Sequence, residues 1–234
     1  MCDGMIQWVS KTSSNGKYTY PKQCSNCTVP WALNRAFGLS DQDKRVALGE
    51  YEAHLKELEK KPVKDKENEA ARNALRGLMA DPKGEDQSVM LIGPPGTGKT
   101  FLGIHCLAWV IANKTPISGF YLPEHLFFKA WRASHSQDSK REREWGLSVI
   151  RRAKAVDILL LDDFGQSRSV SPGAADALES LIMSRYDKKA NMIITTNRTP
   201  SALKEHRGDR VISRISGMTG GKVVELTCTD WRQR

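Results

Sequence analysis

The chain of 234 residues lacks the features that mark membrane and secreted proteins. It contains no run of 18 apolar residues, so no membrane-spanning helix is predicted. The segment from Met1 to Ile6 shows no basic stretch followed by an apolar one, so no secretory signal is predicted either. Its five cysteines form an odd number, which favours free thiols in a reducing compartment. We therefore expect a cytoplasmic protein that makes no contact with a membrane.

The composition is that of a folded protein with a basic surface. Hydrophobic residues make up 39% and charged residues 27%, and the length suits one large domain with a small appendage. The net charge of +9 and the pI of about 9.4 favour polyanionic partners such as nucleic acid. A basic surface that serves only solubility is the alternative, and composition does not separate the two.

The first part of the chain differs from the rest. Residues 1–39 show weak periodicity and hold three of the cysteines. Ser40 resembles a helix cap, and the helical spacing of the apolar residues from Leu48 to Leu58 predicts a helix that Pro62 stops. The charged stretch 60–69 is typical of a linker, and a second helix is predicted around residues 71–78.

Strands and helices alternate from Val89 onward. This alternation predicts a mainly parallel sheet in an α/β domain, and the third and fourth strands are apolar enough to be covered on both faces. We find no internal repeat. The predicted strands are 89–92, 117–122, 157–161, 191–196 and 223–227, and a helix over 101–111 follows the first of them.

A phosphate-binding motif lies between that first strand and its helix. The segment fits G-x-x-x-x-G-K-[ST], in which glycines let backbone N–H groups turn toward phosphates at a helix N-terminus. Lys99 would reach the β and γ phosphates of ATP, and the Thr100 hydroxyl would ligate Mg²⁺. The nucleotide-binding residues predicted here are Gly93, Pro94, Pro95, Gly96, Thr97, Gly98, Lys99, Thr100 and Phe101.

Three further motifs follow in order along the chain. The segment 156–164 is an apolar strand that ends in Asp162 and Asp163 and resembles the Walker B element. Asp162 would hold Mg²⁺, and Asp163 would orient or deprotonate the attacking water, although its side chain is one methylene shorter than glutamate. The next apolar strand ends in Asn197, and Arg210 and Arg214 then share one helical face.

Taken in order, GPPGTGKT, LLLDDFG, IITTN and GDRVISRI resemble the DnaC/IstB branch of the AAA+ ATPases over roughly residues 68–232. The resemblance implies an α/β P-loop NTPase fold with a five-stranded sheet in the order 5-1-4-3-2, ATP hydrolysis between subunits, and a homo-oligomeric ring or spiral on DNA. It also implies a sensor role for Asn197, an arginine finger at Arg214 with Arg210 as the alternative, and a weak match of Arg232 to the second sensor.

Two members of this branch fit the size of the chain. We interpret it as a helicase loader of the DnaC type, which binds single-stranded DNA and delivers a replicative ring helicase. The alternative is an IstB-like ATPase that directs a transposase to duplex DNA, and a protein that binds ATP without hydrolysing it is a further one. In either case residues 1–60 would form an extension that binds the partner protein, and residues 61–234 the ATPase domain.

Basic residues follow the second predicted strand, in the region that contributes DNA contacts in the family. Lys and Arg neutralise phosphates, while Phe127, Phe128 and Trp131 fit a buried helix face better than a base-stacking surface. Intervening glutamates are also typical of an ordinary solvated helix. The predicted DNA contacts are Lys129, Arg132, Lys140, Arg141 and Arg143.

Cys24 and Cys27 form a C-x-x-C pair. With Cys2 and the more distant His54 they are candidate ligands of a zinc knuckle, yet a structural zinc site has four ligands at recognisable spacing and only one pair is present. Zn²⁺ and free thiols both stay open. A redox role is disfavoured because no thioredoxin-like pattern surrounds the pair.

Overall fold

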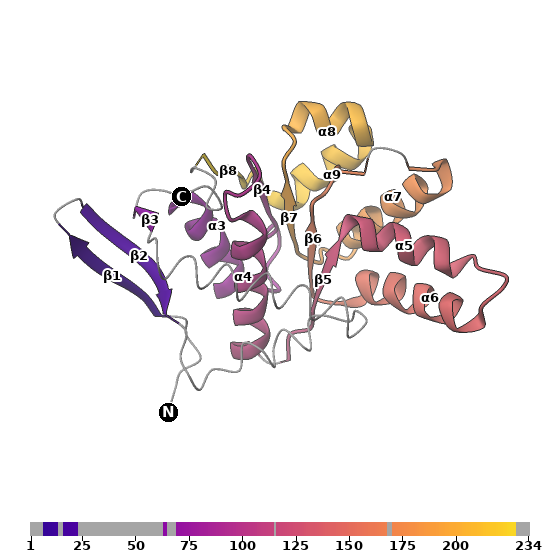
Figure 1. The fold of residues 1–234 in the computed structure, drawn as a ribbon, viewed down its shortest axis with the longest axis horizontal. Helices are drawn as coiled ribbons and strands as arrows, with labels where there is room; N and C mark the ends of the chain where they lie inside the picture. The colour runs from indigo at the N-terminus through magenta and orange to yellow at the C-terminus, as the bar shows by residue number, and fades with distance from the viewer. Residues whose placement is uncertain are drawn as a thin grey trace.

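The computed structural model describes residues 7–13, 16–22, 63–64, 69–114, 116–167 and 170–227 (Figure 1). Its main sheet has five strands in the order β5-β6-β7-β4-β8, and every pair of neighbours is parallel. Numbered along the chain and read from β8, this is the order 5-1-4-3-2, so the predicted fold is confirmed. The strands are β4 (Val89–Ile92), β5 (Gly119–Pro123), β6 (Ile158–Asp162), β7 (Met192–Thr196) and β8 (Val223–Glu225).

Burial explains why these short apolar runs form strands. All residues of the central strands β6 and β7 are buried, as expected for strands covered on both faces, and those of the edge strand β5 are buried as well. The predicted strand 89–92 has the observed bounds, whereas the next strand begins two residues later than predicted, at Gly119. The last strand is shorter than predicted and ends at Glu225.

Helices cover both faces of the sheet. In Figure 1, α3 and α4 lie on one side of the strands, α5, α6 and α7 lie on the other, and α8 lies above the strand ends. Proline at the first turn begins α7 and α8, and the Thr199 hydroxyl caps α8 by accepting from the backbone N–H of Ala202. No described helix is both long and apolar enough to span a bilayer. The helices are α3 (Glu69–Ala80), α4 (Lys99–Asn113), α5 (Glu124–Ser134), α6 (Lys140–Ala155), α7 (Pro172–Asp187), α8 (Pro200–Arg207) and α9 (Asp209–Thr219).

The hairpin of α5 and α6 is packed closely enough to require a glycine. A Cβ placed on Gly146 would lie 2.3 Å from the carbonyl oxygen of Ala130 on the facing helix. Phe127 and Phe128, both on α5, are buried, and their rings meet edge to face at 5.6 Å between centroids. The prediction that these two rings belong to the core is confirmed.

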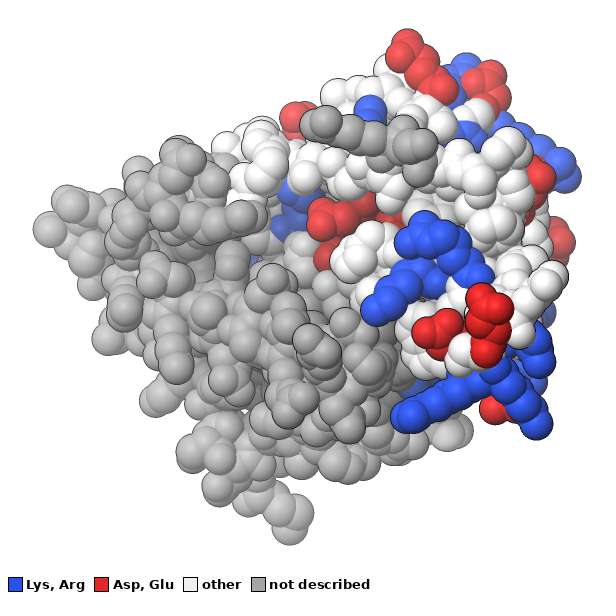
Figure 2. All heavy atoms as spheres, turned by 45° about the vertical axis from the view of Figure 1, so that its right-hand side comes forward, with Lys and Arg blue, Asp and Glu red and all other residues white. Residues whose placement is uncertain are grey.

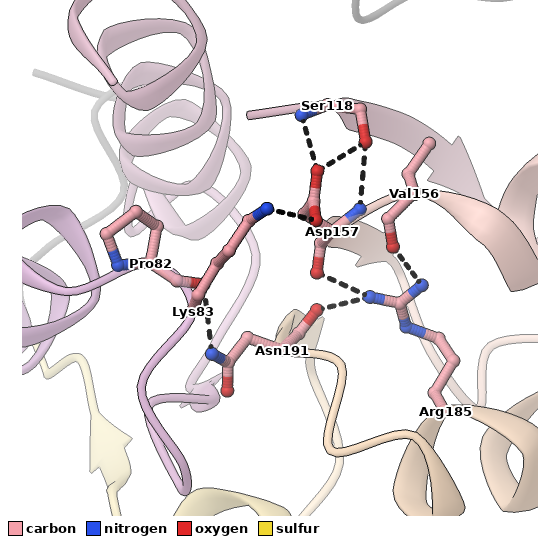
Figure 3. Close-up of polar contacts among 7 residues, drawn as sticks. All are labelled: Pro82, Lys83, Ser118, Val156, Asp157, Arg185 and Asn191. Carbon is pink, nitrogen blue, oxygen red and sulfur yellow. Dashed lines mark hydrogen bonds and ion pairs between the residues drawn. The ribbon is translucent and has the colours of Figure 1, made fainter. Parts of the chain in front are cut away.

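A buried arginine ties together the amino ends of the strands (Figure 3). Arg185, on α7, has no exposed surface, and its two terminal nitrogens donate to the backbone carbonyls of Ala153, Val156, Asp157 and Asn191 at 2.6–3.0 Å. Burial lowers the pKa of Arg185 to about 10, while the nearby charge of Asp157 acts in the opposite direction. The guanidinium therefore satisfies carbonyl groups just before β6 and β7 that would otherwise be buried without partners.

The neighbouring carboxylate of Asp157 fixes the start of β5. It accepts from the backbone N–H and the hydroxyl of Ser118 at 2.8 and 2.6 Å, and Lys83 forms an ion pair with it at 3.4 Å (Figure 3). The side-chain amide of Asn191 donates to the carbonyls of Pro82 and Gly84, which fastens the segment that leads into β4.

A second, antiparallel sheet lies in the N-terminal part of the chain. β1 (Gln7–Ser13) pairs with β2 (Gly16–Lys22), and β2 pairs with β3 (Val63–Lys64). Sequence analysis does not predict these strands, and β3 lies within the stretch expected to be a linker. The helix predicted after Ser40 lies outside the described residues.

Candidate functional site

The loop from Gly93 to Gly98 connects β4 to α4 and has the backbone of a phosphate cradle. Gly93, Gly96 and Gly98 have positive φ values of 144°, 76° and 86°, which non-glycine residues rarely adopt. A Cβ on Gly93 would lie 2.3 Å from the carbonyl oxygen of Leu226, so this position also lacks room for a side chain. Such a loop turns its N–H groups toward one point at the positive end of α4.

Lys99, the first residue of α4, lies folded over this loop. Its ammonium group donates to the carbonyl oxygens of Gly93 and Pro94 at 2.8 and 2.6 Å, and the side chain is largely buried. The Thr97 hydroxyl also donates to the carbonyl of Pro94, at 2.9 Å. The positively charged Lys99 ammonium group is thus held where the loop would receive the β and γ phosphates of ATP.

Thr100 and Asp162 come together across two elements. The Thr100 hydroxyl donates to Asp162 Oδ1 at 2.8 Å, which joins the start of α4 to the carboxyl end of β6. Two further hydroxyls, from Tyr121 on β5 and Thr195 on β7, donate to the same carboxylate at 3.0 and 2.5 Å. Sequence analysis missed these two residues, because Tyr121 belongs to no motif and the motif IITTN points to Asn197 and not to the hydroxyl of Thr195.

The surroundings of Asp162 change the pKa of its carboxylate. Burial and, second, the charge of Asp163 raise the pKa of Asp162 to about 6, while the hydrogen bonds from Thr195, Thr100 and Tyr121 oppose that rise. A divalent cation at this position would favour the ionised form.

These residues fit ATP and Mg²⁺. Hydroxyl and carboxylate oxygens are the ligands that Mg²⁺ prefers, and Thr100 and Asp162 present them to the same space beside the cradle. Mg²⁺ held there would neutralise charge on the terminal phosphates. Lys99 and the loop would bind and orient the phosphate chain.

Asp163 and Asn197 lie exposed beyond the ends of the neighbouring strands β6 and β7. Asp163 has a left-handed backbone with φ of 54°, and its N–H donates to the Thr195 hydroxyl at 3.0 Å. Because β6 and β7 are parallel neighbours, both residues lie at the carboxyl end of the sheet, as Asp162 does. The structure thus gathers Lys99, Thr100, Asp162, Asp163 and Asn197 at one end of the sheet.

Comparison with known proteins decides the family. The IstB-like ATP binding protein family matches residues 50–215, which is most of the chain. The chain belongs to this family. No curated protein matches the chain.

Solved structures share the fold of this IstB-like protein. The DnaC helicase loader superposes with a TM-score of 0.54 at 24% identity, over 67% of this chain and 88% of that one. DnaI superposes at 0.55 and 20% identity, over 69% and 82%. The replication initiator DnaA, bound to AMPPCP and single-stranded DNA, superposes at 0.58 and 22% identity, over 70% and 47%, so the chain spans about half the length of that initiator. The protein is therefore an IstB-like ATP binding protein by family, and it shares its fold with these solved structures.

The two finger candidates of the IstB-like domain both lie on α9 and both contact α7. The guanidinium of Arg214 stacks over the Tyr186 ring at 4.5 Å and is half-buried. Arg210 is 72% exposed and forms an ion pair with Glu179 at 3.1 Å. Of the two, Arg210 has the freer access to a neighbouring molecule, while Arg214 would have to leave its stacking position. Arg232 lies outside the described residues.

The candidate DNA contacts lie on the α5–α6 hairpin. Figure 2 shows basic side chains on this face with acidic ones between them. Arg132, Lys140 and Arg141 are exposed, Lys129 lies over the Trp145 ring at 5.7 Å, and Arg143 donates to the carbonyl of Ser136. A hollow of about 170 Å³ next to Arg132 is lined by His125, Phe128, Trp131, Ser167, Val170, Ser171 and Ala174.

The zinc candidates Cys2, Cys24, Cys27 and His54 lie outside the described residues. Among the residues that the structure does describe, no group of three or more His, Cys, Asp or Glu could hold a metal ion. Cys106 is buried in α4, and burial raises the pKa of its thiol to about 12, so this thiol stays protonated.

Proposed function

We propose that this protein is an ATP-hydrolysing helicase loader of the DnaC type, which binds single-stranded DNA and delivers a replicative ring helicase. The observation that carries the ATPase part is the 2.8 Å hydrogen bond between Thr100 and Asp162. It brings the phosphate loop and the Walker B carboxylate to one place, as a single complex of nucleotide and Mg²⁺ requires. The helicase-loader part is supported by the fold shared with DnaC and DnaI.

In this proposal the residues at the end of the sheet divide the work. Lys99 and the glycine loop bind the phosphates, and Thr100 and Asp162 hold Mg²⁺. Asp163 orients the attacking water and accepts its proton, with Asn197 beside it. The arginine that completes the site comes from α9 of a neighbouring copy, and a homo-oligomeric ring or spiral supplies that neighbour.

The rest of the chain would connect this ATPase to its partners. The basic residues of the α5–α6 hairpin contact the phosphates of single-stranded DNA, with Arg132, Lys140 and Arg141 the most accessible of the five candidates. Residues 1–60 bind the partner protein, and residues 61–234 form the ATPase domain. Zn²⁺ would bind at Cys24 and Cys27 together with two further ligands.

The second candidate function is transposase targeting, which is compatible with the IstB-like family match. A protein of this kind would act on duplex DNA and would bind a transposase in place of a helicase. A protein that binds ATP and barely hydrolyses it is the third outcome, because Asp163 has a shorter reach than glutamate.

A nucleotide experiment tests the ATPase part. The full-length protein should bind a fluorescent ATP analogue and release phosphate from ATP, and Lys99→Ala should reduce both by about a hundredfold or more because it removes the charge opposite the phosphates. Lys83→Ala, at the opposite end of the sheet, is the matched control and should leave both unchanged. Binding without phosphate release, with or without DNA, would reduce the protein to an ATP-dependent adaptor.

A DNA experiment separates the two partner classes. We expect tighter binding to single-stranded than to duplex DNA of equal length, weakened by salt because phosphate contacts dominate. We also expect ATP-dependent loading of a purified replicative helicase onto closed circular single-stranded DNA. Preference for duplex DNA together with stimulation of a transposase would replace the loader by the second candidate.

A further inference from the structure

Hydrogen bonds connect the segment 164–167, which follows the candidate catalytic residue Asp163, to the end of β7, to the loop after β7 and to α8. The Arg198 guanidinium donates to the carbonyl of Gly165 at 2.5 Å, and a ring nitrogen of His206 lies 3.0 Å from the carbonyl oxygen of Ser167. The Thr196 hydroxyl donates to the carbonyl of Phe164 at 2.6 Å. A change in the backbone that follows Asp163 would therefore reach α8 directly.

A buried ion pair between Glu124 and Arg207 also connects this segment to α8. Glu124, the first residue of α5, accepts from the backbone N–H groups of Gly165 and Ser167 at 2.9 and 3.1 Å. The same carboxylate accepts from Arg207, the last residue of α8, at 2.7 Å. The two side chains are only 1% and 6% exposed, so the pair is screened little by solvent.

The surroundings of Arg207 argue for a role besides stability. Its guanidinium lies 5.5 and 6.0 Å from the ring centroids of Phe128 and Phe164, in a place where apolar side chains would serve stability as well as an ion pair does. Its Nε is buried and has no hydrogen-bond partner among the described residues, so this arrangement leaves one donor without an acceptor. The Nε of the structural Arg185 is unpaired as well, so it is the ion pair buried among apolar rings, and not the unpaired donor alone, that invites a functional explanation.

One residue separates Arg207 from the helix that carries the finger candidates. Gly208 has φ of 87° and ψ of 153° and directly joins α8 to α9, on which Arg210 and Arg214 lie. Because the joint is so short, a rotation of the end of α8 must change the direction in which α9 presents these arginines.

We propose that Glu124 and Arg207 form a positioning pair that couples the nucleotide state of a subunit's own site to the orientation of its α9 arginines. The inference rests on the proposed function, since α9 is assigned there to the site of a neighbouring copy. The coupling runs from the segment after Asp163 through Glu124 and Arg207 to α8, and from α8 across Gly208 to α9.

Hydrogen–deuterium exchange of the full-length protein tests this coupling without requiring ATP turnover. Exchange is followed in peptides that cover α8 and α9, with and without AMPPCP and Mg²⁺. The variants are E124Q, R207K and the charge-balanced double variant E124Q/R207M, which avoids leaving one buried charge alone. K204Q is the matched control, because the exposed pair of Lys204 and Asp209 also bridges α8 and α9.

In the wild type and in K204Q we expect AMPPCP to change the exchange rate of these peptides by about fivefold or more, the lower end of ordinary site-to-site coupling. In E124Q/R207M the change should fall below about twofold, while AMPPCP still binds, and R207K should lie between the two. The inference is overturned if the double variant responds as the wild type does, or if the wild type shows no response in α8 and α9. Failure of the proposed function would register separately, as absence of phosphate release from a wild type whose peptides still respond.

Discussion

At the amino end of the five-stranded sheet lies the buried Arg185 guanidinium, and at the carboxyl end lies the buried Asp162 carboxylate. Arg185 is surrounded by carbonyl oxygens of the main chain, which the strands and turns fix in place. Asp162 is surrounded by the hydroxyls of Thr100, Tyr121 and Thr195. A hydroxyl can rotate and accept as well as donate, whereas a main-chain carbonyl has no such freedom.

This difference separates a structural charge from a functional one. The partners of the two terminal nitrogens of Arg185 come from the chain itself, so these nitrogens need no ligand. The partners of Asp162 can rearrange around a cation, so the carboxyl end can exchange protein contacts for Mg²⁺. Substitutions at the two ends should therefore affect different quantities: turnover at the carboxyl end and unfolding free energy at the amino end.

The largest effect is expected for the arginine that a second copy is proposed to contribute at the carboxyl end of the sheet. Arg214→Ala should lower ATP turnover by about a thousandfold and leave ATP binding intact, because a finger stabilises charge only in the transition state. Phosphate release and fluorescent-nucleotide binding measure the two quantities. Arg210→Ala is the parallel variant, and a larger loss for Arg210 would move the finger role to that residue.

A mixture of two variants tests whether the arginine acts on the nucleotide site of a neighbouring subunit. Arg214→Ala supplies a nucleotide site without a finger, and Lys99→Ala supplies a finger without a nucleotide site. An equal mixture should recover about a quarter of wild-type turnover if neighbouring subunits share the site head to tail. No recovery in an oligomer that contains both variants would place the arginine within its own subunit.

The next effect concerns the amino end. Arg185→Leu should lower the free energy of unfolding by about 3 kcal/mol or more, because it leaves buried carbonyl groups without donors. Urea denaturation measures this loss, and ATP affinity of the folded fraction should not change. Arg151→Leu removes an exposed arginine and should alter stability by less than about 0.5 kcal/mol. Equal losses in both variants would contradict the structural role of Arg185.

A smaller effect tests α4, the helix that runs from the phosphate loop into the core. Burial lowers the pKa of His105 to about 4, against 6.5 in an unfolded chain. The unfolded state therefore binds this proton first, and the stability that neutral His105 provides is complete above pH 6.5 and is lost as the pH falls toward 4. At pH 5 the loss relative to pH 8 should be about 2 kcal/mol.

The difference in pH dependence between the wild type and His105→Leu measures the contribution of His105 to the free energy of unfolding. The raised pKa of Asp162 acts with the opposite sign over the same pH range, and it cancels in the difference between the two proteins. Urea denaturation at pH 5 and pH 8 should show a smaller change for His105→Leu. An identical pH dependence in both proteins would show that His105 is not buried as a neutral ring.

The smallest effect probes the hydroxyls around Asp162. Tyr121→Phe removes one of them and keeps the ring, so we expect a loss of about 1 kcal/mol, or about fivefold, in kcat with little change in KM. Tyr186→Phe keeps the ring that Arg214 stacks on and should leave kcat unchanged. A loss confined to KM would assign Tyr121 to nucleotide binding and not to the holding of Asp162.

The parts of this molecule that could be predicted from its sequence are those written in local patterns. The phosphate loop, Asp162 and Asn197 each follow a short apolar strand, and parallel topology alone brings strand ends together. The hairpin of β1 and β2 also had a local signal, since the dipeptide Asn15-Gly16 is typical of a hairpin turn and Gly16 begins β2, but weak periodicity obscured it.

The buried charges could not be predicted, because their burial depends on contacts between distant segments. Glu124 and Arg207 are 83 residues apart, and Arg185 lies in a polar stretch that is typical of a solvated helix end. Tyr121 and Thr195 were missed for the related reason that their hydroxyls acquire a role only where three strands meet at Asp162. Sequence patterns predict the strands, but the arrangement of the strands in the sheet determines which polar atoms come into contact.

The left-handed backbone of Asp163 has a consequence for anyone who wishes to lengthen the acid there. Asparagine and aspartate tolerate that conformation better than other side chains, because their short polar groups can bond locally. Glutamate at position 163 would gain reach and incur a main-chain penalty of about 1 kcal/mol. In this protein the choice between the two acids is thus made by a torsion angle as much as by chemistry, and a faster enzyme would call for redesign of the turn together with its carboxylate.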